Sequence, residues 1–253
     1  MVSIVMAYYN RLPLLLNTLN TISLSECKDY EIVIVDDFSD QNHSLSVLSQ
    51  LYPNLNMRIV YMSDVYDTKW YANPCVVYNA GFKEAKGDKI IIQNSECMHV
   101  GDVLSFAQQH LQKHTYLSFR CFAHEFPSNQ GIRFHNSILP GGWYNHEAHR
   151  PTGFHFCNAI TKDNLMKLNG FDERFATNYA WDDNEFYYRV NLLGLHVKFV
   201  QRDDIFVIHQ DHRNTLLYPW SDPNKDGKSF AANQKLFEQI CNEKKVRAEK
   251  GII

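Results

Sequence analysis

Acidic side chains follow two apolar segments of the chain, at the points where each segment gives way to polar residues. Asp36 comes directly after the run Glu31–Val35, and Glu96 lies three residues after the run Lys89–Gln93. If both runs are parallel strands, their carboxyl ends meet at the edge where open α/β sheets bind ligands. There, a carboxylate such as Asp36 can accept the N3–H of a uracil or bind a ribose hydroxyl. Glu96 offers a hard oxygen ligand for Mg²⁺ or Mn²⁺.

Each of these acids also has a purely structural explanation. Asp and Ser side chains in the run Asp36–Asp40 can cap backbone amides in a turn between a strand and a helix. A single glutamate in a loop, such as Glu96, is usually just solvated. Residue type and spacing alone therefore leave a ligand site and a turn as equally good interpretations of Asp36, and they make Glu96 a weak signal.

Two further acids, Asp182 and Asp183, open the clearest helical pattern of the chain, Asp182–Leu193. Acids in the first turn of a helix interact favourably with its dipole, which is a structural explanation for both. Glu185 and Arg189 are four residues apart on the same helix and form a predicted structural ion pair.

Histidines follow the last predicted strand, Ile205–Ile208. His209 stands directly at its end, and His212 and Arg213 come shortly afterwards. A histidine at a strand end can bind a borderline metal ion. Because the chain contains 12 histidines, residue type alone does not single out His209.

The elements that must position these residues alternate between short β-type runs and amphipathic helical runs. The predicted strands are Val2–Met6, Glu31–Val35, Met57–Met62, Lys89–Gln93, Tyr116–Phe122, Phe156–Ile160, His196–Val200 and Ile205–Ile208. The predicted helices are Arg11–Ile22, Ser44–Tyr52, Pro74–Ala85, Gly101–His114, Asp182–Leu193 and Phe230–Lys244. This alternation predicts an α/β fold with right-handed crossovers and a mainly parallel sheet. The long segment Ala123–His155 has little periodicity, which is typical of a lid or a binding loop.

Composition excludes several classes of protein. The 253 residues include 25 basic and 28 acidic side chains, so no excess of positive charge is available to bind a nucleic-acid backbone. The apolar runs are only a few residues long, far short of the roughly 20 that span a bilayer. Neither GxGxxG nor GxxxxGK[ST] occurs, which argues against a Rossmann dehydrogenase or a P-loop enzyme.

The cysteines and the first residues of the chain give an expectation for its cellular location. The six cysteines form no CxxC pair and are expected to be free thiols, which favours a reducing environment. The chain enters a strand at Val2 without a basic or apolar leader, so no signal peptide is expected. A cytoplasmic location is the resulting expectation.

The order of these motifs resembles that of the GT-A glycosyltransferases, especially the inverting family two. Val2–Asn10, Asp36–Asp40 and Asn79–Gly81 look like the successive N-terminal motifs of that family. Asn94–Glu96 takes the place of its metal-binding Asp-x-Asp. The stretch from Gly170 to Phe186 resembles the C-terminal half of galactosyl- and N-acetylgalactosaminyl-transferases, including chondroitin-type polymerases. The resemblance spans about residues 2–213.

This resemblance implies a GT-A fold, with a mainly parallel central sheet flanked by helices, in a single domain over residues 1–253. Residues 1–115 would form the nucleotide-binding half and residues 116–220 the acceptor and catalytic half. Residues 221–253 would form a C-terminal tail helix.

The implied activity is an inverting transfer of a sugar from a nucleotide diphosphate donor, a UDP-sugar, to a hydroxyl of a glycan, glycoprotein or glycolipid acceptor. Asp183 would be the general base and Asp182 would position the acceptor, while Glu96 and His209 would bind Mn²⁺ or Mg²⁺. The residues expected to contact the donor are Ala7, Tyr9, Asn10, Asp36, Asn79, Asn94 and Arg213.

The sequence departs from the family pattern at two places. Asn94 stands where a charged ligand is usual, so Glu96 must carry the metal. The usual basic residue before Asn79 is missing, which leaves His212 or Arg213 to hold the diphosphate.

Two alternatives from other classes remain open. The first is a nucleotide-sugar-binding protein without activity, which the departure at Asn94 makes plausible. A sugar nucleotidyltransferase has a related core, but it would need a Gly-rich, basic N-terminal loop that Ala7–Arg11 does not provide. Trp143 and Tyr144 fit either acceptor stacking or the core equally well.

Overall fold

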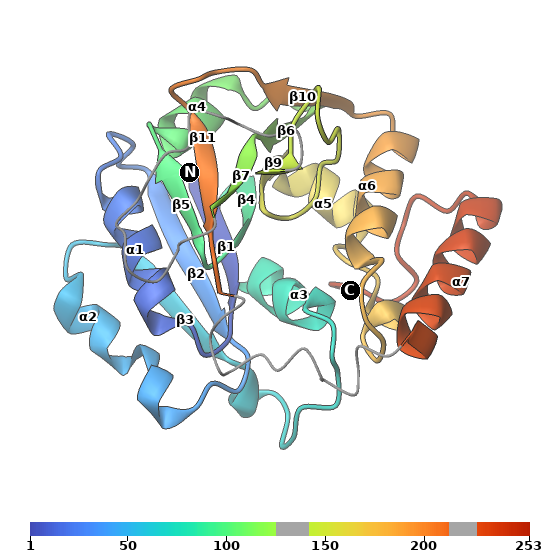
Figure 1. The fold of residues 1–253 in the computed structure, drawn as a ribbon, viewed down its shortest axis with the longest axis horizontal. Helices are drawn as coiled ribbons and strands as arrows, with labels where there is room; N and C mark the ends of the chain where they lie inside the picture. Colours follow the sequence, from blue (N-terminus) through green and yellow to red (C-terminus); the bar gives the residue numbers. More distant parts are fainter. Residues whose placement is uncertain (125–141, 213–226) are drawn as a thin grey trace.

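The computed structural model describes residues 1–124, 142–212 and 227–253, and its centre is a seven-stranded sheet (Figure 1). The strand order is β10-β6-β9-β4-β1-β2-β3. The strands are β1 (Val2–Tyr8), β2 (Tyr30–Asp36), β3 (Met57–Tyr61), β4 (Lys89–Asn94), β6 (Thr115–Phe119), β9 (Cys157–Thr161) and β10 (His196–Val200). Only β9 runs antiparallel to its neighbours, β4 and β6. The mainly parallel sheet predicted from the alternating pattern is therefore confirmed.

A second, four-stranded sheet has the order β5-β11-β7-β8. Its strands are β5 (Cys97–Val100), β7 (Cys121–His124), β8 (Trp143–Asn145) and β11 (Phe206–Gln210). Strand β5 begins three residues after β4 ends and pairs antiparallel with β11, so that Cys97 lies opposite His209. This pairing brings the late histidines beside Glu96.

Helices cover both faces of the large sheet. They are α1 (Leu12–Ser23), α2 (Leu48–Leu51), α3 (Cys75–Glu84), α4 (Val103–His110), α5 (Lys162–Leu168) and α6 (Asp182–Leu192). Short 3₁₀ turns span Gln41–His43, Leu45–Val47, Met62–Asp64 and Glu173–Phe175. Figure 1 shows α1 and α2 on one side of the sheet and α3, α5 and α6 on the other.

Side chains alternate along β1 between two apolar clusters, as the period of a strand requires. Ile4 and Met6 pack in the cluster that contains the buried leucines of α1. Val5 points to the other cluster, with α3. Helix α3 approaches β1 so closely that a Cβ on Gly81 would lie 2.4 Å from a methyl group of Val5. Only glycine fits at that contact, which fixes α3 against the sheet.

The last helix, α7 (Gly227–Glu243), packs against the start of α6. The ring of Trp181 lies 5.2 Å from that of Phe237. The Asn233 side chain is fully buried and donates to the backbone oxygens of Ala180 (2.8 Å) and Phe175 (3.2 Å). Ala180 and Trp181 both have positive φ, so the turn that opens α6 is strained and is tied directly to α7.

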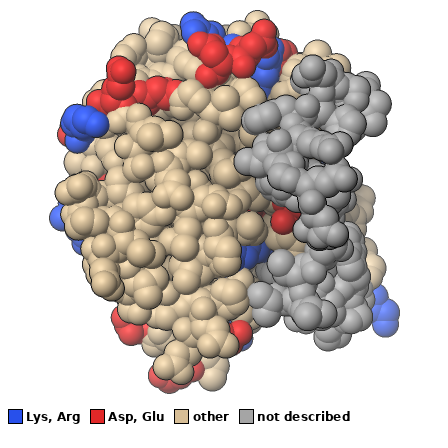
Figure 2. Space-filling model, turned by 60° about the vertical axis from the view of Figure 1, so that its left-hand side comes forward, with Lys and Arg blue, Asp and Glu red and all other residues tan. Residues whose placement is uncertain are grey.

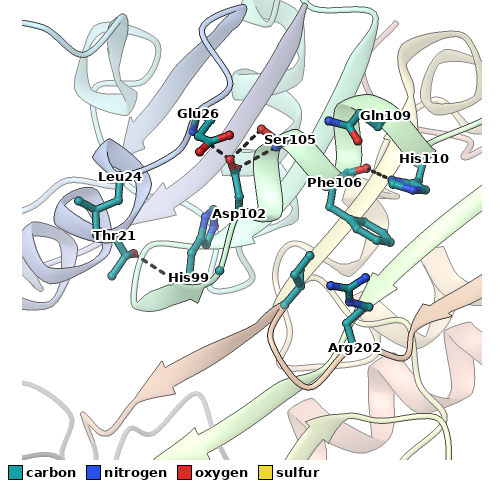
Figure 3. A pocket seen from close by; sticks show the side chains of 12 residues that line it. Thr21, Leu24, Glu26, His99, Asp102, Ser105, Phe106, Gln109, His110 and Arg202 are labelled. Carbon is teal, nitrogen blue, oxygen red and sulfur yellow. Dashed lines mark hydrogen bonds between the residues drawn. The ribbon is translucent and has the colours of Figure 1, made fainter.

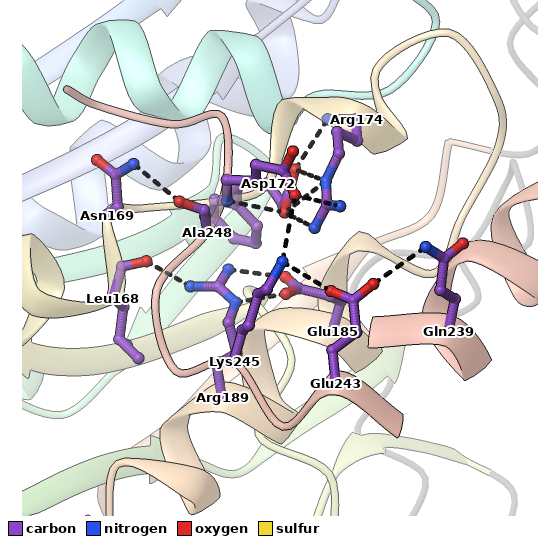
Figure 4. A network of polar contacts seen from close by, with 12 residues as sticks. Leu168, Asn169, Asp172, Arg174, Glu185, Arg189, Gln239, Glu243, Lys245 and Ala248 are labelled. Carbon is purple, nitrogen blue, oxygen red and sulfur yellow. Dashed lines mark hydrogen bonds and ion pairs between the residues drawn. The ribbon is translucent and has the colours of Figure 1, made fainter. Parts of the chain in front are cut away.

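A buried ion pair stabilises α6. Glu185 and Arg189 are both buried, and the Arg189 Nη2 donates to Glu185 Oε2 at 2.7 Å. The same guanidinium donates to the backbone oxygens of Leu168 (2.6 Å) and Gly170 (2.9 Å), as Figure 4 shows in part. The structural ion pair predicted from the sequence is confirmed.

Replacing Arg189 by Ala should lower the free energy of unfolding by about 3–5 kcal/mol, because it leaves the Glu185 carboxylate buried without its cation. Urea unfolding would measure the loss. Arg202→Ala is a matched control, since the Arg202–Asp204 pair is solvent-exposed and its removal should hardly change stability. Equal effects of the two variants would contradict this interpretation.

Two predicted elements differ from the structure, and three observed elements were not predicted. The predicted strand Tyr116–Phe122 is two strands, β6 and β7, which belong to different sheets and separate at Arg120. The predicted helix Ser44–Tyr52 is a 3₁₀ turn followed by the single turn α2. The pattern also missed β5, β8 and α5, because each is short; in addition, β5 and β8 pair with strands that are distant in sequence.

The face over α1 and α2 carries few charges, as the uncharged surface in Figure 2 shows. No charged residue occurs in segments 12–25 and 41–57. All six cysteines are free, as predicted, and five of them are buried. Within residues 1–124, 142–212 and 227–253, no helix combines the length and apolar character needed to cross a membrane.

Candidate active site

The carboxyl ends of β1, β2 and β4 form one edge of the large sheet. In the register of these parallel strands, Tyr8 lies opposite Asp36 and Ala7 lies opposite Asn94. Three of the residues expected to contact a donor, Ala7, Asp36 and Asn94, therefore lie at the same edge. This is the edge at which parallel α/β sheets bind their ligands.

The loops after β1 and β2 are tied to each other through Asn10. Its side chain donates to Asp40 Oδ2 (2.9 Å) and accepts from the Asp40 backbone N–H (2.7 Å). The Asn10 backbone N–H donates to the Ser39 hydroxyl at 3.0 Å. Asn10 thus shapes the crevice, and its amide is already committed to these contacts.

Asp36 is buried at the end of β2, and burial raises the pKa of its carboxyl. Within the described residues, the hydrogen bonds to this carboxylate come from Ser39, whose backbone N–H donates to Oδ1 (3.2 Å). The Asp36 side chain therefore keeps acceptor capacity for a ligand group.

A basic residue that the sequence analysis did not identify lies beside this edge. Lys69 donates to Asp37 Oδ2 (2.6 Å), and its ammonium lies 4.5 Å from the centre of the Tyr9 ring. Tyr71 donates to the other oxygen of Asp37 at 2.7 Å. Lys69 provides a positive charge near the N-terminal loops, although it lies outside the motif in which the family's basic residue was expected.

Glu96 is the centre of the first polar cluster of the site. Its Oε1 lies 3.3 Å from His209 Nε2 and 3.4 Å from His212 Nε2. The guanidinium of Arg11, at the start of α1, donates to the same oxygen at 2.5 Å. The structure therefore brings together the two predicted metal ligands, Glu96 and His209, and adds His212 to them.

The charges around Glu96 determine its protonation. Burial alone would raise the pKa of Glu96, but the Arg11 guanidinium and the two neighbouring imidazoles hold it well below its usual value. Glu96 is thus an anion in the interior. One carboxylate and two imidazoles, with ligand atoms within 4.8 Å of one another, fit a divalent ion such as Mn²⁺.

Gln210 holds β11 in place behind this cluster. It is buried, and its Nε2 donates to the backbone oxygens of Glu96 (3.0 Å) and Leu14 (2.9 Å). Asn17 of α1 donates to its Oε1 at 2.8 Å. A single amide thereby fixes β11, α1 and the Glu96 loop relative to one another, so His209 is held beside Glu96.

The second cluster consists of Asp182, Asp183 and His155. Asp183 Oδ1 accepts from the His155 backbone N–H (3.1 Å) and from His155 Nδ1. Trp181 is the N-cap of α6 and makes no side-chain capping hydrogen bond, and Asp182 and Asp183 lie in the first turn, where the predicted interaction with the helix dipole is retained. His155 was not identified from the sequence.

Asp182 is buried, with only 4% of its surface exposed. Asn73 donates to Oδ1 of Asp182 at 2.8 Å, and among the described residues Oδ2 of Asp182 has no hydrogen-bond partner. Burial and the neighbouring Asp183 charge raise the pKa of Asp182 to about 6. Such a carboxyl exchanges protons near neutral pH, which is a property typical of functional sites.

Aromatic rings connect the two clusters. The Tyr78 ring lies 5.0 Å from the His155 ring, and its hydroxyl donates to Asn94 Oδ1 at 2.8 Å. On the other side, Tyr144 stacks on Phe156 and its ring lies 4.9 Å from that of His209. The Glu96 cluster and the Asp183 cluster therefore belong to one site.

The remaining residues predicted for the site do not belong to either polar cluster. Asn79 is buried and hydrogen-bonded to the backbone N–H and oxygen of Phe171 and to Glu173, so its amide joins α3 to the loop before α6. Trp143 is buried, whereas Tyr144 is partly exposed. Arg213, like most of the segment Ala123–His155 before Gly142, lies outside the described residues.

A cavity of about 560 Å³ lies away from this site (Figure 3). Thr21, Leu24, His99, Phe106 and Arg202 are among its lining residues. It borders the amino end of β11, whereas His209 lies at the other end of that strand. None of the predicted site residues lines this cavity.

The sequence matches one family model and one curated relative. Residues 3–169, more than half of the chain, match the family model described as glycosyl transferase family 2. The uncharacterized glycosyltransferase YwdF of Bacillus subtilis (strain 168) is 34% identical over 91 residues. That match covers 36% of this chain and only 31% of YwdF.

Solved structures share the fold. The crystal structure of S. aureus TarS 1-349 in complex with UDP-GlcNAc matches with a TM-score of 0.68 at 16% identity. This match covers 99% of this chain and 68% of that chain. The mannosyltransferase PcManGT from Pyrobaculum calidifontis, in complex with GDP-Man and Mn²⁺, matches with a TM-score of 0.60 at 15% identity. This second match covers 84% of this chain and 57% of that chain.

Proposed function

The chain belongs to glycosyl transferase family 2, and from that premise we propose that it transfers a sugar from a UDP-sugar donor to a hydroxyl acceptor with inversion. The predicted GT-A fold and family are confirmed. The observation that carries the proposal is the meeting of two clusters at one sheet edge. Glu96 and its histidines would form the cation site, and Asp183 would provide the carboxylate for the acceptor side.

The nucleotide would lie over the ends of β1 and β2. Asp36 would accept a hydrogen bond from the base, because its carboxylate is buried at the strand end and keeps acceptor capacity. Ala7, Tyr9 and Asn94 line the same edge. Arg213 stays a predicted contact to the diphosphate, and Lys69 is a further basic candidate.

Glu96, His209 and His212 would hold Mn²⁺ or Mg²⁺ next to the diphosphate. A divalent ion there supplies positive charge that stabilises the departing UDP. The chain itself contributes the Arg11 guanidinium, which lies at the same carboxylate.

On the acceptor side, Asp183 would act as the general base. As the acceptor oxygen bonds to the anomeric carbon, its proton passes to Asp183. The bond between the anomeric carbon and the β-phosphate oxygen breaks, and its electron pair leaves with UDP. A single displacement of this kind inverts the anomeric centre and passes through an oxocarbenium-like transition state. Asp182 would position the acceptor, which we propose to be a hydroxyl of a glycan, glycoprotein or glycolipid.

The direct test is a panel of nucleotide sugars incubated with the protein, Mn²⁺ and candidate acceptors. Release of free nucleotide and formation of a glycosylated product are measured together. Product formation with one UDP-sugar supports the proposal. Tight donor binding without product from any acceptor would favour a nucleotide-sugar-binding protein instead.

UDP should raise the melting temperature more than ADP does, because Asp36 can accept the N3–H of uracil, whereas the corresponding ring nitrogen of adenine, N1, is itself an acceptor. At roughly 100-fold excess over Kd, the expected shift with UDP is about 5–10 °C. Thermal scans with UDP, ADP and GDP measure it. Asp36→Ala should abolish the preference, whereas Asp29→Ala, at the opposite end of β2, should keep it. Equal shifts for all three nucleotides would remove Asp36 from base recognition.

A further inference from the structure

His155 is a polar residue of the site to which the proposed reaction assigns no role. It immediately precedes Phe156 and β9, at the end of the long irregular segment. Its side chain is only 13% exposed. A buried histidine at the centre of a polar cluster has either a structural or a functional reason to be there.

Two hydrogen bonds from His155 end on the same oxygen of Asp183. Its backbone N–H and its ring Nδ1 both donate to Oδ1 of Asp183. Within the described residues, every hydrogen bond to the Asp183 carboxylate ends on this oxygen, so Oδ2 keeps its lone pairs for another donor.

Aromatic neighbours fix the orientation of the imidazole. The ring centres of Tyr78, Phe171 and Phe156 lie 5.0, 5.9 and 6.0 Å from that of His155. Rings on several sides leave the imidazole little freedom to rotate, so Nδ1 stays directed at Asp183. A side chain locked by packing in this way is what a precise active-site geometry requires.

We propose that His155 is a positioning residue that holds Oδ1 of Asp183 and leaves Oδ2 to take the acceptor proton. This inference rests on the proposed function, because it assigns the two oxygens of the proposed base to different tasks. His155 itself does not accept the proton in this arrangement.

Kinetics of two His155 variants test the assignment. His155→Leu removes the ring donor, and kcat should fall roughly 10-fold to 100-fold while KM for the donor stays constant, because the base is no longer aligned. His155→Asn places an amide N–H near the position of Nδ1 and should restore most of the lost rate. His196→Leu, at an exposed histidine of β10, is the matched control and should have no effect.

Two kinetic outcomes would overturn the proposal. If both His155 variants lose activity to the same extent as Asp183→Asn, His155 is itself the base. If neither variant changes kcat, the hydrogen bond to Asp183 has no part in catalysis. Melting curves of each variant show whether a loss of rate reflects a loss of folding.

An NMR titration of labelled histidines tests the pair without any turnover. Burial alone would lower the pKa of His155, but the Asp183 carboxylate outweighs it and raises the pKa above its ordinary value. In Asp183→Asn the His155 pKa should therefore fall. An unchanged His155 pKa in that variant would overturn the inference. A clear decrease with no glycosyl transfer would support the pairing while contradicting the proposed function.

Discussion

Asp183→Asn should lower the rate of glycosyl transfer by about 10²–10⁴-fold and leave donor affinity nearly unchanged. The amide keeps the size of the carboxylate and can still accept from His155 through its oxygen. It cannot accept the proton of the acceptor hydroxyl. The loss should therefore appear in kcat, because the altered group acts on the acceptor and not on the nucleotide.

Transfer rates and calorimetric UDP titrations on the same preparations measure both quantities. Asp163→Asn is the matched control, because Asp163 is an exposed acid in the first turn of α5 and has no part in the site. Full transfer by Asp183→Asn, with intact UDP binding, would exclude Asp183 as the base. The raised pKa of Asp182, about 6, would then make Asp182 the next candidate.

Glu96→Gln should lower activity by about 10²-fold or more, and excess EDTA should do the same to the unmodified protein. The amide fits the same space, but it lacks the negative charge that a divalent ion needs in this interior position. Loss of a metal contribution of several kcal/mol corresponds to a rate loss of this size.

Calorimetry with Mn²⁺ in the presence of UDP should show weakened metal binding for Glu96→Gln. This readout does not depend on turnover. Glu84→Gln, at an exposed residue of α3, should behave like the unmodified protein. Full activity in excess EDTA would contradict a metal role for Glu96 and its histidines, and would leave Arg11 as the cation nearest the Glu96 carboxylate.

The sequence supports the central α/β prediction because the strands beside the site are continuous apolar runs. Ile32–Val35 and Ile90–Ile92 are buried on both faces of the sheet, which is why they contain few polar residues. Their ends could be located to within a residue or two, and the acids at those ends with them. Asp36 and Glu96 were therefore accessible from pattern alone.

Contacts between distant segments could not be predicted in this way. The pairing of His155 with Asp183 joins an irregular loop to the first turn of α6, and neither segment has a pattern that refers to the other. Lys69 likewise approaches Tyr9 only because the segment between β3 and α3 folds back against the loop after β1. The clustering of histidines in the long segment was the only available signal for His155, and 12 histidines made it too weak.

The contact between α7 and the turn before α6 lies beyond the segment that matches the family model. The family match ends at residue 169, yet Asn233 holds the carbonyl of Ala180, two residues before Asp182. The geometry of the turn before Asp182 therefore depends on a side chain some fifty residues later in the chain. We expect substitutions at Asn233 to shift Asp182 and Asp183, and so to alter the proposed transfer without touching a substrate.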